Sequence, residues 1–210
     1  SDTLINRIKS YLYHKGEYHP ENELSFAPAL CNRIDRNTCG IVIAAKNAES
    51  LRILNQKIRD RELTKLYLCI ACGKVTPDSA TLTAYLEKNS DTNTVKISDK
   101  KTKSNLTIKT KYKVIAYNGE NSLLKVDLLT GRTHQIRAHL AYIGHALLGD
   151  GKYGNNKLNK KYGFKYQALC SYELQFKFTT DAGCLSYLDG KCFKAKAPDF
   201  VKMFGSNIKL

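Results

Sequence analysis

The stretch "LLTGRTHQIRAHLAYIGHALLGDGKYG", residues 128–154, marks a change of period in the chain. The residues before it alternate between polar and apolar, whereas Ile136 and Leu140 within it repeat at helical spacing. Thr133 is a candidate N-cap, and Gly144 is a stop signal. The stretch therefore predicts a strand followed by a helix whose first turn carries many polar side chains.

Working outward from this helix, most of the chain is predicted to be strand. Alternating or apolar runs indicate strands at residues 40–46, 64–73, 80–87, 93–98, 105–117, 122–129, 168–178 and 184–193. Further helices are predicted near residues 1–15, 48–60 and 197–204, with Ser1 or Asp2 and then Asn47 as caps, and residues 149–166 read as a loop. No βαβ alternation runs throughout, so the sequence predicts an α+β fold with a mixed, largely antiparallel β-sheet and flanking helices.

The charge of the chain limits its partners. Lys and Arg number 34 against 19 Asp and Glu, which gives a formal net charge of +15. Such an excess attracts polyanions, so a nucleic-acid partner is expected; a lysine-rich genome that places Lys on every surface is the alternative.

The cysteines and the apolar runs indicate the cellular compartment of the protein and whether a metal site is to be expected. Seven cysteines, without a signal peptide or a run long enough to cross a bilayer, favour reduced thiols in a cytoplasmic protein. Cys69 and Cys72 lie in a predicted strand, where positions three apart face opposite sides. No second CxxC pair exists to complete four ligands, so no metal site is predicted.

A lone acid, Asp35, lies between Arg33 and Arg36 in "NRIDR" just before an apolar run. A surface ion pair, which contributes little, is the reading that the residues alone favour. The functional reading is an ionised carboxylate beside a guanidinium, able to act as base or nucleophile.

The start of the predicted helix combines residue types that recognise RNA. The cluster consists of Arg132, Thr133, His134, Gln135, Arg137 and His139. The free amides of a helix start suit phosphate, whereas two His five residues apart, about 140° around the helix, do not suit zinc. Arg137 follows a core-facing residue, so its guanidinium is expected at the core edge, where it could meet an acid from elsewhere. The alternative is a solvated polar face.

Tyr67 alternates with Leu66 and Leu68 in the strand "TKLYLCIACG". A core or edge tyrosine is the favoured interpretation, and an aromatic that stacks on an extruded base is the functional one.

Together, in this order, these stretches resemble the RluA-type pseudouridine synthases. "NRIDRNTCGIVIAAKN" resembles the first catalytic motif of that family, HRLDRxTSGLLLxAK, and "KLYLCIACG" resembles its Lys-x-Tyr strand. "GRTHQIRAHLAYIGHALLGDGKYG" matches its GRTHQIRxHL…GHPLLGDxxYG signature almost residue for residue. The resemblance extends from about residue 2 to 203.

The resemblance implies a role for each matching position. Asp35 matches the catalytic aspartate, Tyr67 the tyrosine packed against the target base, and Arg137 the arginine paired with the aspartate. The RNA-binding residues implied or suggested are Arg33, Arg36, Arg132, Thr133, His134, Gln135 and Lys152. The reaction, isomerisation of uridine in RNA with base flipping, needs no cofactor and no metal.

The resemblance also predicts one catalytic domain over residues 1–210. The N-terminal S4 RNA-binding domain of many relatives is not in this sequence, so the chain is either a trimmed catalytic domain or a short member. Structured RNA is the expected partner, with large-subunit ribosomal RNA ahead of transfer RNA, and neither a membrane nor an obligate protein partner is inferred. A non-catalytic basic RNA-binding or ribosome-assembly module is the alternative, and a metal-dependent nuclease or hydrolase is a weaker one.

Overall fold

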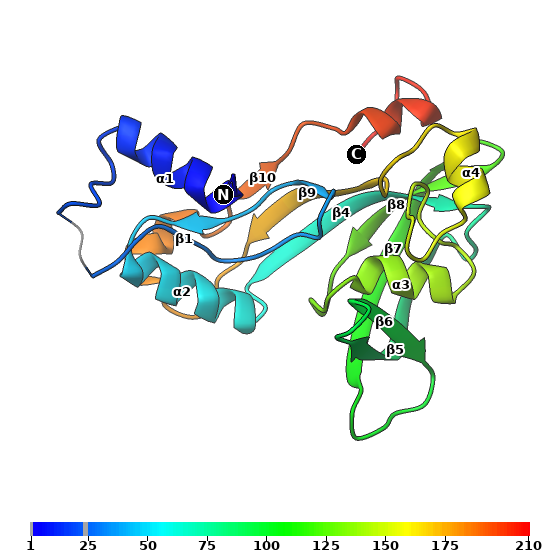
Figure 1. Cartoon of the computed structure of the whole chain (residues 1–210), viewed down its shortest axis with the longest axis horizontal. Helices are drawn as coiled ribbons and strands as arrows, with labels where there is room; N and C mark the ends of the chain where they lie inside the picture. The colour runs from blue at the N-terminus through cyan, green and yellow to red at the C-terminus, as the bar shows by residue number, and fades with distance from the viewer. Residues whose placement is uncertain (1, 23–24) are drawn as a thin grey trace. The chain divides into compact units, whose positions relative to one another are not determined.

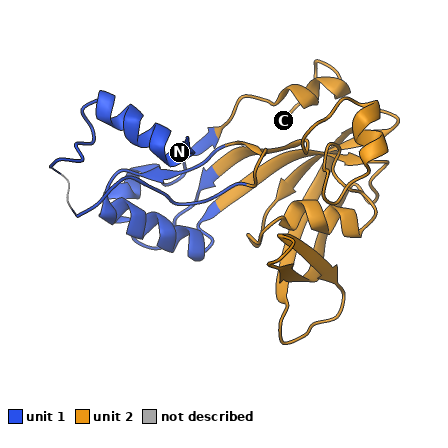
Figure 2. Cartoon of the chain, viewed as in Figure 1, with its two compact units in different colours: residues 1–34, 41–63, 175–193 blue, residues 35–40, 64–174, 194–210 orange. Residues whose placement is uncertain are grey.

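The structure is a computed structural model that describes residues 2–22 and 25–210 (Figure 1). The chain forms two compact units (Figure 2). The first unit contains Ser1–Ile34, Ile41–Leu63 and Gln175–Phe193, and the second contains Asp35–Gly40, Thr64–Leu174 and Lys194–Leu210. Asp35, Tyr67 and Arg137 all belong to the second unit.

Helices make up most of the regular secondary structure of the first unit. It contains α1 (Leu4–His14), the antiparallel pair β1 (Ala29–Leu30) and β3 (Ala44–Ala45), α2 (Ala48–Arg59) and the 3₁₀ helix η1 (Gly183–Leu188). Asn47 caps α2 as predicted, because its side chain accepts a hydrogen bond from Ser50 N. The predicted cap of α1 is wrong for Asp2, which instead pairs with Arg7, and Thr3 takes the N-cap position. Ser1 lies outside the described residues.

A buried ion pair secures the end of α2. Lys57 Nζ lies 2.7 Å from Glu62 Oε2, and it also donates to the backbone oxygen of Thr180. The hydrogen bond from Lys57 holds the pKa of Glu62 at about 2, against the effect of burial.

The second unit is built on a mixed sheet. Its strands lie in the order β9 (Leu169–Phe176), β4 (Leu63–Cys72), β8 (Asn121–Asp127), β7 (Leu106–Tyr117), β5 (Ser79–Asn89) and β6 (Thr94–Ser98). The pairs β4–β8, β8–β7, β7–β5 and β5–β6 are antiparallel, and β2 (Cys39–Gly40) joins β9 in parallel. The predicted mixed, largely antiparallel sheet is therefore confirmed.

The two faces of this sheet bury different groups of side chains. On one face, Tyr67 and Val126 share a core with Ile136 and Leu140 of α3 (Gln135–Tyr142), which packs against β5, β6 and β7. The neighbouring residue Leu68 enters the core on the opposite face, under the 3₁₀ helix η2 (Asp199–Phe204). The predicted alternation along β4 is confirmed, and it places Tyr67 on the same face as α3.

The start of α3 differs from the prediction. His134, and not Thr133, occupies the N-cap position, and its φ of 52° is left-handed. The side chain of Gln135 fixes this turn, because its Oε1 accepts hydrogen bonds from Arg132 N and from Thr130 Oγ1. Gly144, with a φ of 88°, follows the helix as the predicted stop.

Three predictions of secondary structure are wrong in part. Only Gly40 and 44–45 are extended strand within 40–46, because Gly40 turns the chain with a φ of 111°. Residues 184–193 form η1 and the start of β10 (Cys192–Lys194), since the Asp181 carboxylate accepts from Gly183 N and starts a helical turn. The predicted loop 149–166 contains the short helix α4 (Asn156–Lys161), capped by Asn155.

The cysteines and helices add two further observations. All seven cysteines are free thiols. Cys69 is buried with the α3 face of the sheet and Cys72 packs on the other, which confirms that they face opposite sides. Within residues 2–22 and 25–210, no helix has both the length and the apolar character that a membrane span requires.

A buried histidine makes the stability of this fold depend on pH. His139 is 1% exposed, and its Nδ1 lies 2.9 Å from Thr110 Oγ1, which accepts a hydrogen bond from Gln135 Nε2. Burial lowers the pKa of His139 from 6.5 to about 4.

We expect the stability to fall as the pH is lowered from about 6.5 through about 4, because the unfolded chain takes up a proton there that folded His139 refuses. The full effect is on the order of 3 kcal/mol of unfolding free energy. In His139→Asn, whose amide oxygen can still accept from Thr110, this part of the acid destabilisation should disappear in urea titrations at several pH values. His14→Gln, at an exposed histidine, is the control and should retain this part of the acid destabilisation. An unchanged profile in His139→Asn would contradict the assignment.

Candidate active site

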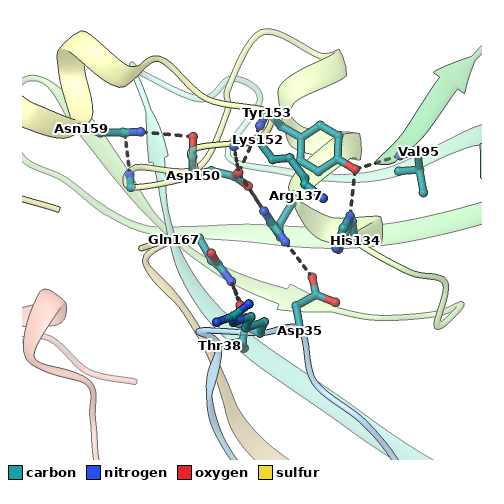
Figure 3. Close-up of polar contacts among 12 residues, drawn as sticks. Asp35, Thr38, Val95, His134, Arg137, Asp150, Lys152, Tyr153, Asn159 and Gln167 are labelled. Atoms are coloured by element: carbon teal, nitrogen blue, oxygen red, sulfur yellow. Dashed lines mark hydrogen bonds and ion pairs between the residues drawn. The ribbon is translucent and has the colours of Figure 1, made fainter. Parts of the chain in front are cut away.

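Asp35 lies in a tight turn before β2. Thr38 N donates to the Asp35 backbone oxygen at 3.0 Å, and Asn37 takes a left-handed φ of 67°, which Asn tolerates well. Gln167 fixes the turn from outside: its Nε2 donates to Arg36 O at 2.7 Å and to Thr38 Oγ1 at 3.1 Å (Figure 3). The carboxylate therefore stands on a loop whose backbone is tied to the start of β9.

Gly40 brings this loop directly against β9. Cys39 and Gly40 pair in parallel with Cys170 and Ser171. A Cβ atom on Gly40 would lie 2.1 Å from the backbone oxygen of Ser171, so only glycine permits this approach. The spacing between the Asp35 turn and the sheet is thereby fixed by backbone contact.

Arg137 bridges two carboxylates. Its Nε and Nη2 donate to Asp150 Oδ2 and Oδ1 at 2.7 and 2.9 Å, and its Nη1 lies 3.4 Å from Asp35 Oδ2 (Figure 3). The side chains of Asp35, Arg137 and Asp150 are 17%, 8% and 0% exposed. The structure thus brings Asp35 and Arg137 together, but the closer, two-point partner of Arg137 is an acid that the sequence reasoning missed.

Asp150 belongs to a turn that wraps around the guanidinium. Its Oδ1 also accepts hydrogen bonds from the backbone amides of Lys152 and Tyr153 at 2.8 and 3.1 Å. Asn159 of α4 holds the turn from behind, because its Nδ2 donates to Asp150 O while its Oδ1 accepts from Gly149 N. A fully buried carboxylate is thereby surrounded by donors on both oxygens.

The ion pair shifts the protonation equilibria of both partners toward their charged forms. Burial would raise the pKa of Asp150, but the hydrogen bonds and charge of Arg137, with the two turn amides, lower it below its usual value. Burial would likewise lower the pKa of Arg137, but Asp150 first and Asp35 second raise it. Asp150 and Arg137 are therefore both charged at neutral pH, and together with Asp35 they form the trio of groups at this site.

Tyr153 links the turn to the start of α3. Its ring lies under the Arg137 guanidinium, with 5.4 Å from Cζ to the ring centroid. Its hydroxyl accepts from Val95 N and lies 2.9 Å from His134 Nδ1. Burial lowers the pKa of His134, which favours the neutral imidazole in this contact.

Tyr67 closes the site on the sheet side. It is 6% exposed, and its hydroxyl is hydrogen-bonded to Ser171. Burial raises the pKa of Tyr67, and the negative charge of Asp35 adds to the rise. Tyr67 thus stays a neutral phenol close enough to Asp35 to sense its charge.

The remaining predicted residues separate into exposed and buried groups. Arg36, Arg132 and Lys152 of the second unit are exposed, as is Arg33 of the first. Thr133 is half-buried. The amide of Gln135 is 2% exposed and donates to Lys109 O and Thr110 Oγ1, so its polar groups serve the fold and are not presented to a ligand.

The same pattern that singled out Asp35 was present at Asp150. Residues 149–166 contain several lysines and only one acid, Asp150. A lone carboxylate among cations in an otherwise basic loop was the available signal. The helical register had already indicated that Arg137 would meet an acid from elsewhere in the chain.

This arrangement supports chemistry at one carboxylate. Asp35 is the most exposed member of the trio, and its Oδ1 accepts no hydrogen bond from any residue that the structure describes. A negative oxygen held in place from one side can act as a nucleophile or as a base.

Removing the positive charge of Arg137 should destabilise the fold, because Asp150 would lose its counter-ion. Arg137→Ala leaves a fully buried carboxylate without its counter-ion, a change that costs about 3–5 kcal/mol. Urea unfolding should show this loss at neutral pH, and the loss should shrink in acid, where Asp150 takes up a proton. The double variant Arg137→Ala, Asp150→Asn should recover part of the stability. Equal stability of Arg137→Ala and wild type would contradict the assignment.

Comparisons with known proteins bear on the family of this chain. The sequence profile described as RNA pseudouridylate synthase matches residues 6–142. An uncharacterised RNA pseudouridine synthase of Mycoplasma genitalium is 36% identical over 181 residues, which are 83% of this chain and 55% of that protein. The ribosomal large subunit pseudouridine synthase D of Borreliella burgdorferi is 34% identical over 73% of this chain and 46% of its own length. The mitochondrial tRNA pseudouridine(32) synthase of Saccharomyces cerevisiae is 33% identical over 66% of this chain and 30% of its own length.

The chain spans about half the length of the first two of these relatives. Among solved structures, human RNA pseudouridylate synthase domain containing 4 superposes with a TM-score of 0.73 at 18% identity, covering 97% of this chain and 82% of that one. Human RNA pseudouridylate synthase domain containing 1 superposes with a TM-score of 0.65 at 24% identity, covering 82% of this chain and 69% of that one. These two likenesses show the fold. The profile match over most of the chain, together with the motifs gathered around Asp35, shows that this chain belongs to the RNA pseudouridylate synthase family.

Proposed function

We propose that this chain isomerises specific uridines in structured RNA to pseudouridine, with Asp35 as the catalytic carboxylate. The observation that carries the proposal is the ion pair between Arg137 Nη1 and Asp35 Oδ2 at 3.4 Å, in which the carboxylate stays partly exposed while its partner is buried. A charged carboxylate that is both held and reachable is the group that the reaction requires.

The reaction is balanced without a cofactor. The C1′–N1 bond of uridine breaks, the detached uracil rotates, and a C1′–C5 bond forms, while the C5 proton is lost and N1 gains one. Asp35 would attack C1′ as a nucleophile or remove the 2′ proton as a base, and either route needs an ionised oxygen. The target uridine must leave its helix first, at a cost of about a few kcal/mol.

Tyr67 and Arg137 support this chemistry in different ways. Tyr67 lies 6% exposed beside the carboxylate and would pack against the extruded base. Arg137 is already bonded to Asp150 at two points, so it would orient Asp35 rather than bind phosphate.

For the RNA we propose large-subunit ribosomal RNA, with transfer RNA as the second possibility. The name of one relative, a ribosomal large subunit pseudouridine synthase at 34% identity, supports ribosomal RNA. The name of another, a tRNA pseudouridine synthase at 33% identity, supports transfer RNA. The net charge of +15 would favour either polyanion.

The proposed phosphate contacts come from exposed cations. Arg33, Arg36, Arg132 and Lys152 have exposed side chains. Thr133 would contribute from the half-buried first turn of α3. His134 and Gln135 are left out of the proposed contact surface, because both are buried and bonded within the protein.

Asp35→Asn should abolish the reaction and leave RNA binding within about threefold, because it removes the negative charge and keeps the shape. Tritium release from transcripts that carry 5-tritiated uridine measures the reaction, with large-subunit ribosomal RNA and transfer RNA as separate substrates. We expect the rate to fall at least 1,000-fold, which is about 4 kcal/mol of barrier.

Asp127→Asn is the matched control, since Asp127 is a partly buried aspartate of the same unit. It should retain a rate within threefold of wild type. A rate for Asp35→Asn close to that of wild type would contradict the proposed chemistry. If wild type binds both RNAs and releases tritium from neither, the non-catalytic RNA-binding module becomes the better description.

Lysines of α4 should contribute to RNA affinity and not to the reaction. Lys157 and Lys160 are exposed, whereas Lys161 of the same helix already lies 2.8 Å from Glu120. Changing Lys157 and Lys160 to Ala should lower the slope of log affinity against log salt by roughly 1.5, with the single-turnover rate at saturating RNA unchanged. Lys161→Ala should change the slope less. Equal slopes for wild type and the double variant would remove α4 from the proposed surface.

A further inference from the structure

We propose that Asp150 is a positioning residue for the reaction at Asp35. Asp150 takes the Nε–H group and one Nη2–H group of Arg137, and it thereby fixes the direction from which Nη1 meets the catalytic carboxylate. This inference rests on the proposed function and names the group that sets the strength of the contact between Arg137 and Asp35.

The geometry shows which partner controls the guanidinium. Arg137 makes two parallel hydrogen bonds to Asp150, at 2.7 and 2.9 Å, and a single contact of 3.4 Å to Asp35. Two-point pairing of Arg with a carboxylate is stronger and more directional than a single long contact. Arg137 is therefore oriented by Asp150 and only touches Asp35.

Asp150 is itself held independently of Asp35. Its Oδ1 accepts the amides of Lys152 and Tyr153, and its backbone oxygen accepts Asn159 Nδ2. The Tyr153 ring lies against the guanidinium that Asp150 binds. The turn and α4 together form a fixed support, so the direction of Nη1 does not depend on the reacting group.

The charges indicate why the support matters for reactivity. One guanidinium faces two carboxylates, and the one in closer contact is Asp150. Asp35 consequently keeps a negative charge that its neighbour only partly compensates, with its Oδ1 free of hydrogen bonds from the described residues. Without Asp150, the guanidinium of Arg137 would no longer be held in one orientation, so neither the direction nor the strength of its contact with Asp35 would be fixed.

The amide of Asn cannot replace this carboxylate. In Asp150→Asn the oxygen can still accept the amides of Lys152 and Tyr153. The amide NH₂ would then face Arg137 Nε, where two donors oppose each other. The turn and the bond from Arg137 Nη2 are thus retained, while the bond from Nε and the negative charge are lost, which separates the two roles of Asp150.

The first experiment follows the Arg137 Nε–H group by proton–nitrogen NMR and does not depend on activity. The signal is assigned by its absence in Arg137→Lys. We expect a slowly exchanging Nε–H in wild type and in Asp35→Asn, because Nε is bonded to Asp150. In Asp150→Asn we expect its exchange with water to become at least tenfold faster.

The second experiment measures tritium release under single-turnover conditions with ribosomal and transfer RNA transcripts labelled with 5-tritiated uridine. Asp150→Asn should lower the rate at saturating RNA at least 100-fold and change the RNA concentration for half-maximal rate less than threefold. Asp150→Glu, which keeps the charge on a longer side chain, should recover at least tenfold of that loss.

Glu173→Gln is the matched control, because Glu173 is also buried, at 4% exposed, and lies 2.8 Å from Lys125 Nζ. It should be destabilised in thermal melts like Asp150→Asn yet keep a rate within threefold of wild type. If Asp150→Asn does not melt cooperatively, the rate of Asp150→Glu is compared with that of Asp150→Ala instead.

Two results would overturn the inference: a protected Arg137 Nε–H in Asp150→Asn, or a rate for that variant within threefold of wild type. A wild-type protein that releases no tritium from either RNA would overturn the proposed function instead. The NMR comparison would then still decide whether Asp150 holds Arg137.

Discussion

The structure around the candidate site depends on the burial of one ion pair. Taking a carboxylate and a guanidinium out of water costs several kcal/mol for each ion, and a good geometry with further hydrogen bonds is needed to offset that cost. Asp150 and Arg137 meet this requirement with two parallel bonds, two turn amides and an aromatic ring against the guanidinium. The guanidinium of Arg137 must therefore be held in one place beside α3, and the turn at 149–154 must close over it.

The sheet and the helix bring together three segments that are far apart in the sequence. Asp35 comes from the turn before β2, Arg137 from α3 and Asp150 from the turn after it. Each segment is secured by different side chains: Gln167 bonds the first, the core residues Ile136 and Leu140 anchor the second, and Asn159 bonds the third. Because each is fixed separately, a carboxylate on a loop can still have a defined position.

The sequence was sufficient to predict the periodic elements of this fold. The alternation along β4 and the helical repeat of α3 follow from burial on one face, and so do the sides on which Tyr67, Ile136 and Arg137 lie. The N-cap of α3 was misplaced because a side chain bond from Gln135 replaced the usual cap. Asp150 was not identified because its partner is set by tertiary packing, which local patterns do not report.

The misjudged polar residues have a common cause. A cluster of Arg, His and Gln at a helix start favours RNA contact only if the side chains point outward. Here Gln135 and His139 point into a buried chain of hydrogen bonds through Thr110, so their polarity serves the interior. Polarity alone does not distinguish a satisfied buried network from a binding surface, and the distinction needs the positions of the partners.

The glycines beside the two carboxylates have a consequence for how the gene can change over time. A methyl group on Gly40 would meet the Ser171 oxygen at 2.1 Å, and one on Gly149 would meet the Tyr166 oxygen at 2.0 Å. Nearly every missense change at these two codons therefore places a side chain against backbone that packs on the segments carrying Asp35 and Asp150. Lineages descended from this protein should retain the two glycines long after their overall similarity has faded.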